Sequence, residues 1–233
     1  MRRGWLIVAM AAAGCAGERA ASPAAPAEGR TMTYLALGDS YTIGESVPAD
    51  QRWPVQLAAL LRAEGLDVAE PRIIARTGWT TDELDAGIDA AAPAGPFDLV
   101  SLSIGVNNQF RGRPVVEYGD QFAALLARAI DFAGARPERV FVVSIPDWGA
   151  TPYAANDPRG RTPQRIGAEI DAFNQTAARE CRRLGVTFID ITPGSRRARR
   201  DAELIASDGL HPSGKMYAEW AAAALPAARG ALR

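Results

Sequence analysis

From Thr31 onward, short apolar runs alternate with longer segments whose apolar positions recur every three or four residues. The apolar runs cover residues 33–37, 72–75, 97–105, 139–145 and 186–191. The segments with helical periodicity cover residues 54–65, 81–91, 115–135, 166–185 and 214–230. Strands that alternate with helices predict a parallel sheet covered by helices on both faces. We therefore expect a flavodoxin-like three-layer α/β/α sandwich with roughly five parallel strands.

The size and charge of the chain limit the number of domains and the kinds of partner that are expected. The chain has 233 residues, 48% of them hydrophobic, which suffices for one sizeable core and predicts one domain over residues 31–233. Lys and Arg number 26 against 27 Asp and Glu, so nucleic acid is not an expected partner. The basic run RRARR at 196–200 is interpreted as a solvated face or a helix end.

The first thirty residues have the order of an export signal followed by a tether. Arg2 and Arg3 precede an apolar segment that is too short to span a bilayer as a mature helix, and small residues lead to Cys15. The region around Cys15 resembles a bacterial lipobox in which Ala12 replaces the usual leucine. Residues 16–30 are rich in Ala and Pro and predict an unfolded tether. We expect a bacterial exported protein, periplasmic or anchored to the membrane through a lipid on Cys15.

The remaining cysteine and the lone histidine argue against a disulfide and a metal site. With Cys15 lipidated or cleaved away, Cys181 has no partner and is expected to be a small apolar packing residue. One histidine and so few cysteines do not make a common zinc site. The segment 209–216 resembles a phosphate-binding loop, but Met216 stands where a hydroxyl must reach magnesium. No metal or cofactor is expected.

Reactive side chains follow three of the predicted strands. In a doubly wound sheet the loops after the strands meet at the carboxyl edge, where ligands bind. Ser40 follows the first apolar run in the sequence Gly-Asp-Ser, Gly78 follows the second, and Asn107 follows the third. Gly-Asp-Ser is by itself an ordinary turn sequence, so its interpretation depends on the other residues that reach this edge.

His211, the only histidine, lies three residues after Asp208. At this spacing a turn lets the carboxylate bind Nδ1 of the ring, which leaves Nε2 free to take a proton from a serine. Ser40 needs such a base because its hydroxyl is a weak nucleophile. An oxyanion would need donors, and the N–H of Ser40, the N–H of Gly78 and the Asn107 amide are candidates. Taken singly, the last two are equally a turn glycine and a strand-end cap.

In their order these residues resemble the SGNH, or GDSL, hydrolase family. The resemblance covers most of residues 32–225 and rests on four blocks: GDSYTIGE, RTGWTT, GVNNQ and DGLHP. It implies the SGNH hydrolase fold, with Ser40 as nucleophile, His211 as general base and Asp208 orienting it. The oxyanion hole would be formed by Ser40, Gly78 and Asn107. The stretches RWPVQLAALL and NNQFRG are similar to the bacterial thioesterase, lysophospholipase and arylesterase branch.

Two positions depart from the family pattern, and one loop has two interpretations. Asn108 stands where the third block usually has aspartate, and Tyr41, expected to pack or to line the pocket mouth, stands where leucine is common. The loop 146–162 carries Trp148 and Tyr153. It is either a lid or acyl-binding wall, in which case these aromatics contact substrate, or a solvated excursion.

These residues predict a serine-dependent hydrolase that cleaves a carboxylic ester or thioester through an acyl-enzyme on Ser40. The expected partner is a small-molecule, lipid or glycan ester. Two alternatives remain open: an O-acetyl transferase or deacetylase acting on envelope polysaccharide, and a non-catalytic envelope binding module. No oligomeric state is predicted.

Overall fold

The computed structural model describes Met1 and residues 30–233, and its centre is one sheet of five parallel strands in the order β2-β1-β3-β4-β5. The strands are β1 (Tyr34–Asp39), β2 (Arg72–Arg76), β3 (Leu99–Ser103), β4 (Val140–Val143) and β5 (Thr187–Ile189). The predicted parallel sheet is therefore confirmed. Residues 2–29, which contain most of the predicted signal peptide and tether as well as Cys15, lie outside the described residues.

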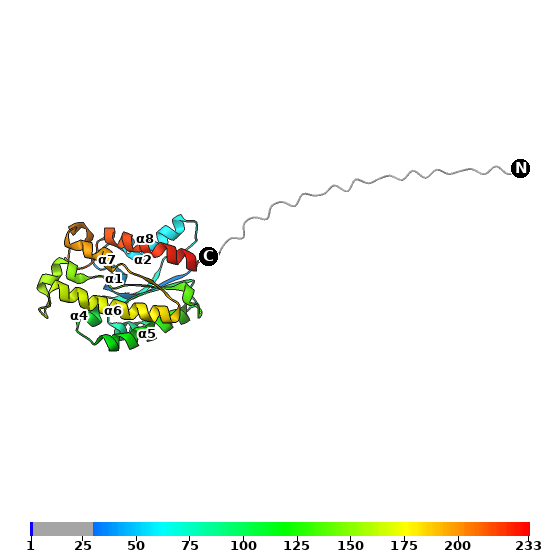
Figure 1. Cartoon of the computed structure of the whole chain (residues 1–233). Coiled ribbons are helices and arrows are strands. Elements are labelled where there is room, and N and C mark those ends of the chain that lie inside the picture. The colour runs from blue at the N-terminus through cyan, green and yellow to red at the C-terminus, as the bar shows by residue number, and fades with distance from the viewer. Residues whose placement is uncertain (2–29) are drawn as a thin grey trace.

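Helices cover both faces of the sheet, which confirms the predicted three-layer sandwich (Figure 1). The long helices are α2 (Trp53–Ala63), α3 (Thr81–Ala91), α5 (Val115–Phe132), α6 (Pro163–Leu184) and α8 (Gly214–Ala231). Helices α2 and α8 pack together on one face, whereas α3, α5 and α6 cover the other. No helix among the described residues is long and apolar enough to cross a membrane.

Helix α6 illustrates how the sequence specifies these helices. The Thr162 side chain accepts a hydrogen bond from the Arg165 N–H and caps the helix, and Gly185 in the left-handed conformation ends it. Between them, buried side chains recur every three or four residues, and Cys181 is one of them. Burying each large apolar side chain contributes about 1.5–3 kcal/mol. Cys181 is thus a packing residue, as predicted.

Strand β1 lies at the point where the chain order reverses, between β2 and β3. All six of its residues are buried, and Gly38 pairs with Ala75 on one side and with Ser103 on the other. Loops that leave such neighbouring strands diverge and open a crevice at their carboxyl ends. The short helices α1 (Ser40–Ile43) and α4 (Val106–Phe110) begin there, directly after β1 and soon after β3.

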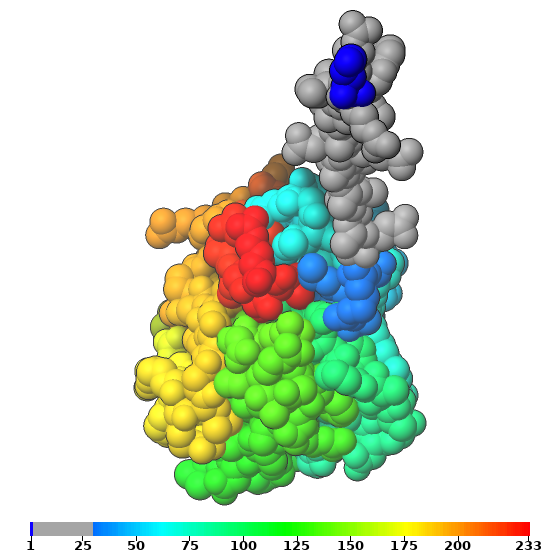
Figure 2. Space-filling view, turned by 90° about the vertical axis from the view of Figure 1, so that its right-hand side faces the viewer, coloured from blue at the N-terminus to red at the C-terminus, as the bar shows by residue number. Residues whose placement is uncertain are grey.

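Different helices lie at the two ends of the strands. Helices α4 and α7 (Thr192–Ser195) lie at one end, while α8 ends at the other (Figure 1). Figure 2 views the molecule from the latter end, where the chain just before β1 (blue) lies beside the end of α8 (red). The carboxyl ends of the strands therefore face the opposite side, where the site described next is located.

Candidate active site

Ser40 is placed by a sharp turn between β1 and α1. The Asp39 carboxylate caps α1 by accepting a hydrogen bond of 3.0 Å from the Tyr41 N–H. A Cβ atom at Gly38 would lie 2.1 Å from the Thr42 hydroxyl oxygen and 2.4 Å from the Ser103 carbonyl oxygen, so only glycine fits. The Gly-Asp-Ser sequence is thus a turn, and this turn carries Ser40 to the edge of the sheet.

A chain of hydrogen bonds joins Ser40 to Asp208 through His211. The Ser40 Oγ lies 3.0 Å from Nε2 of His211, and Nδ1 of the same ring lies 2.5 Å from Oδ2 of Asp208. An ionised carboxylate only accepts hydrogen bonds, so Nδ1 carries the proton and Nε2 is the acceptor for the serine hydroxyl. The structure therefore brings the three predicted residues together in the order that proton transfer from the serine requires.

The Asp208 carboxylate is held by several donors. Its Oδ1 accepts bonds of 2.9 Å from the N–H groups of Leu210 and His211, and its Oδ2 accepts one of 2.7 Å from the Ser46 hydroxyl. Partial burial raises the pKa of this carboxyl, but the bonds from His211, the backbone and Ser46 outweigh burial and bring the pKa below its ordinary value. Asp208 is consequently an anion throughout the neutral pH range.

Asp39, next to the serine, has the opposite character. It is almost completely buried, and burial raises the pKa of its carboxyl to about 7, although the bond from the Tyr41 N–H partly offsets this. Two carboxyl groups near Ser40 therefore differ strongly in their readiness to ionise. Only Asp208 contacts the histidine through its side chain.

The three residues predicted to form the oxyanion hole, Ser40, Gly78 and Asn107, border one pocket together with His211. Gly78 has a φ of +87°, a conformation that disfavours other residues, and its carbonyl accepts a 2.6 Å bond from Arg111. The Asn107 amide donates one hydrogen to the Trp79 carbonyl at 2.9 Å. An amide nitrogen carries two hydrogens, so this bond orients Asn107 and leaves its second hydrogen for another acceptor.

Asn108, where the family usually has aspartate, links α4 to the start of α3. Its amide nitrogen donates to the Thr81 hydroxyl at 2.7 Å, and its amide oxygen accepts from the Thr81 N–H at 3.1 Å. The side chain is completely buried. A neutral amide can both donate and accept, so Asn108 makes both bonds of this link between α4 and α3.

The pocket above Ser40 has a volume of about 150 Å³ and is bordered largely by apolar and aromatic side chains. It is lined by Ser40, Tyr41, Thr77, Gly78, Val106, Asn107, Phe110, Trp148, Tyr153, Leu210 and His211. The Tyr41 ring packs edge-on against His211 with centroids 5.5 Å apart. The first part of the loop after β4 is buried and brings Trp148 and Tyr153 to the pocket, so this part forms a pocket wall. Residues 155–160 of the same loop are mostly exposed to solvent.

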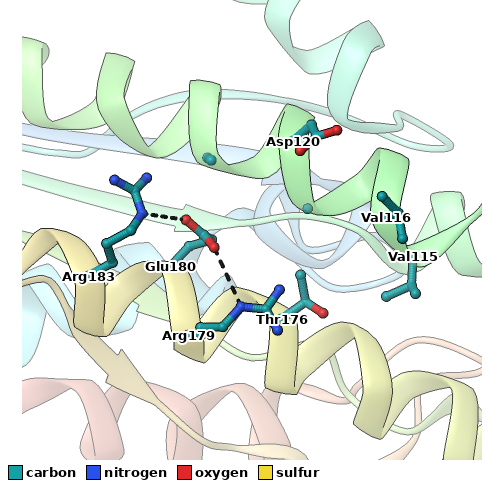
Figure 3. Close-up of a pocket in the computed structure, with 9 residues that line it drawn as sticks. Val115, Val116, Asp120, Thr176, Arg179, Glu180 and Arg183 are labelled. Atoms are coloured by element: carbon teal, nitrogen blue, oxygen red, sulfur yellow. Dashed lines mark hydrogen bonds and ion pairs between the residues drawn. The ribbon is translucent and has the colours of Figure 1, made fainter.

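A larger hollow of about 440 Å³ lies between α5 and α6 and contains none of these residues (Figure 3). Arg179 and Arg183 extend beside it, and both pair with Glu180, at 3.6 Å and 2.8 Å. Asp120 also lines the hollow, so its two positive and two negative side chains balance. Among residues 30–233, no group of three or more His, Cys, Asp or Glu side chains is arranged to hold a metal ion.

Some contacts around the site were not anticipated from the sequence. Ser46 donates to Asp208 across 162 positions of the chain, and no spacing pattern indicates such a pair. Arg196, in the basic run, forms an ion pair of 2.8 Å with the buried Asp147, which follows β4. Part of this basic run therefore anchors the loop that carries Trp148.

The sequence profile of the GDSL-like lipase/acylhydrolase family matches residues 36–219, which include every block of the site. The chain belongs to this family. It is accordingly a carboxylic ester hydrolase, and not the non-catalytic binding module considered as an alternative. No curated protein sequence matches the chain.

Several solved structures share the fold. TesA has 19% sequence identity and a TM-score of 0.66, over 86% of this chain and 99% of that one. A lipase/acylhydrolase from Enterococcus faecalis has 21% identity and a TM-score of 0.62, over 87% and 97% of the two chains. A mutant of Axe2, an acetyl-xylooligosaccharide esterase from Geobacillus Stearmophilus, has 18% identity and a TM-score of 0.64, over 84% and 94%. At such identities the likeness concerns the fold alone.

Proposed function

We propose that the chain hydrolyses a carboxylic ester or thioester through an acyl-enzyme on Ser40. The observation that carries the proposal is the continuous hydrogen-bonded chain from the Ser40 hydroxyl through His211 to the Asp208 carboxylate. Such a chain supplies both a nucleophile and the base that activates it. The adjoining pocket gives a substrate carbonyl access to the hydroxyl.

In the first half-reaction, Ser40 Oγ attacks the carbonyl carbon of the substrate while Nε2 of His211 takes the hydroxyl proton. The tetrahedral intermediate then collapses, the bond to the alcohol or thiol breaks, and His211 returns the proton to the leaving group. Asp208 stabilises the imidazolium that exists between these two transfers. In the second half-reaction water attacks the acyl-enzyme, with His211 again serving as base and then as acid.

The negative charge on the carbonyl oxygen would be stabilised by the N–H groups of Ser40 and Gly78 and by the Asn107 amide. Donors that are already oriented before the reaction stabilise a developing charge more than mobile donors do. The bonds from Arg111 to Gly78 and from Asn107 to the Trp79 carbonyl support this role, because they fix the two loops in advance.

Turnover of p-nitrophenyl esters by residues 31–233 tests the proposal. Ser40→Ala and His211→Ala should each lower kcat by roughly 10⁴-fold or more. A serine-directed phosphonate should label the wild-type protein once, at Ser40, as read by peptide mass spectrometry. Near-wild-type turnover in a folded Ser40→Ala protein, or labelling at another residue, would contradict the proposal.

A second candidate function is deacetylation of an envelope polysaccharide, or acetyl transfer to one. The small pocket favours it, since an acetyl group needs little room. The neighbour that acts on acetyl-xylooligosaccharide has the same fold. Acetate release from acetylated glycan distinguishes deacetylation from general ester hydrolysis, and acetyl-sugar formation in the presence of free glycan identifies transfer.

The proposed setting is outside the cytoplasm, with a lipid anchor on Cys15. This rests on the order of charged, apolar and small residues before Cys15. The full-length protein should partition with the membrane fraction of a bacterial host, and Cys15→Ser should release it. Equal membrane association of the two proteins would argue against lipidation.

A further inference from the structure

A row of three aromatic rings closes one side of the pocket. Phe110 comes from α4, and Trp148 and Tyr153 come from the two short 3-10 helices after β4, Trp148–Ala150 and Pro152–Asn156. The Phe110 and Trp148 ring centroids are 5.5 Å apart, and those of Trp148 and Tyr153 are 6.2 Å apart, both edge-on. We call these three residues the aromatic wall. Edge-on rings at such distances attract one another, so the wall is a packed unit.

The guanidinium of Arg161 lies against this wall. Its Cζ is 5.2 Å from the Trp148 ring centroid and 5.8 Å from the Phe110 ring centroid. The Arg161 side chain is only 3% exposed. A desolvated cation at this distance from two aromatic rings attracts both of them.

Arg161 also connects the loop, α4 and α6 through its hydrogen bonds. Its Nε and Nη2 each donate to the Asp157 carboxylate at 2.9 Å, and Nη1 donates to Glu169 of α6 at 3.2 Å. Nη1 and Nη2 also donate to the backbone carbonyls of Gln109 and Phe110, at 3.1 Å and 3.3 Å. The fork geometry of guanidinium makes these bonds simultaneously, which the single ammonium of lysine does not do.

A second series of hydrogen bonds connects Trp148 to Glu169. The Trp148 indole N–H donates to the Gln109 side-chain oxygen at 2.8 Å, and the Gln109 amide donates to Glu169 at 2.7 Å. Trp148 is therefore held both through its ring face and through its N–H. The wall is thus fixed in place, and a substrate chain must fit in front of it.

The volume in front of the wall is small. A volume of about 150 Å³ is well below the roughly 300–1,000 Å³ that pockets for drug-sized ligands span. We propose that the site accepts short acyl groups, acetyl to butyryl, and that Arg161 sets this limit by holding Trp148 and Phe110 against the pocket. The proposal rests on the proposed function of Ser40. Arg161 acts in it as a positioning residue and does not touch the substrate.

The test is a chain-length series of p-nitrophenyl acetate, butyrate, octanoate and palmitate, with kcat and KM measured separately. Wild-type kcat/KM should be highest for acetate or butyrate and lower by about tenfold or more for octanoate. The ratio of kcat/KM for octanoate to kcat/KM for acetate should rise by about tenfold in each of Trp148→Leu, Phe110→Ala and Arg161→Lys. The change should come mainly from a lower KM for octanoate.

Arg165→Met is the matched control. Arg165 also binds Glu169, at 3.0 Å, but its side chain is 69% exposed. This variant should keep the wild-type ratio. A folded Arg161→Lys protein with the wild-type ratio would overturn the role of Arg161, and if that variant does not fold, an unchanged ratio in both Trp148→Leu and Phe110→Ala would do so.

The outcomes separate the two proposals. Preference of the wild-type enzyme for octanoate or palmitate, with Ser40→Ala inactive, would overturn the short-acyl inference and leave the proposed function intact. Turnover of every ester that persists in Ser40→Ala would overturn the proposed function and the inference with it. Short-acyl preference that Ser40→Ala abolishes and Trp148→Leu relaxes would support both.

Discussion

The Ser46 hydroxyl donates a 2.7 Å hydrogen bond to Oδ2 of Asp208, the same oxygen that lies 2.5 Å from Nδ1 of His211. Ser46 adopts a φ of +65°, in the left-handed region that serine rarely occupies. Strained backbone of this kind costs on the order of 1–3 kcal/mol and persists where neighbouring contacts fix it. Ser46 thus extends the predicted triad by one residue that orients the carboxylate.

Replacing Ser46 with glycine tests this role. Glycine relieves the backbone strain and removes the hydroxyl, so Ser46→Gly should lower kcat by about tenfold while the melting temperature stays equal or rises. Ser46→Ala should lose similar activity and also some stability, because it removes the hydrogen bond to Asp208 without relieving the backbone strain. Ester turnover and thermal melts of the two variants measure these effects, and wild-type kcat in Ser46→Gly would contradict the role.

Replacing Asp39 with asparagine should change how stability depends on pH. Burial raises the pKa of the Asp39 carboxyl to about 7, so the folded protein retains a proton that the unfolded chain loses near its ordinary pKa. The stabilisation is therefore fully present below about pH 4 and is lost as the pH rises to about 7, a change on the order of 4 kcal/mol. Asn keeps the cap on α1 and has no charge to lose.

Urea unfolding at pH 5 and pH 8 measures this effect. The wild-type free energy of unfolding should fall between these pH values by more than that of Asp39→Asn, and the difference isolates Asp39 because all other groups are shared. Glu203→Gln, a change at an exposed position, serves as the control and should follow the wild type. An equal fall in the free energy of unfolding from pH 5 to pH 8 in wild type and Asp39→Asn would show that Asp39 does not cause the pH dependence.

Replacing Asn107 with alanine should remove one oxyanion donor. Loss of such a donor typically costs about 10²–10³-fold in kcat with a small change in KM. Arg111→Met, which frees the Gly78 carbonyl without touching the substrate, should cost less, about tenfold. Steady-state kinetics on p-nitrophenyl acetate measures both, and an Asn107→Ala enzyme with wild-type kcat would exclude the amide from the oxyanion hole.

Helices and strands could be predicted where the burial of one face gives the sequence a regular spacing of apolar residues. The predicted helix 81–91 coincides with α3, because Thr80 and Glu83 form a capping box that marks its start. The last strand is shorter than the apolar run 186–191, since the chain leaves the sheet where the Asp190 carboxylate accepts hydrogen bonds from the Ser144 hydroxyl and the Thr192 N–H. Helix α4 was missed because five residues are too few to show a period.

The site was predictable to the extent that it follows the ends of strands. Ser40, Gly78 and Asn107 each come after a strand, so topology alone brings them to one edge. The contacts of Ser46 and Arg161 depend instead on how loops pack in three dimensions. Their polar side chains look like ordinary surface residues in the sequence, and only the fold reveals Arg161 between two aromatic rings.

His211 is the only histidine of the chain, and it lies between Ser40 and Asp208. Every imidazole signal in a magnetic resonance spectrum of this protein therefore arises from this one position. The protonation of the ring, its change on acylation and its response to a bound inhibitor can each be followed without resonance assignment. The molecule thus contains a single built-in spectroscopic probe, located where the proposed proton transfers take place.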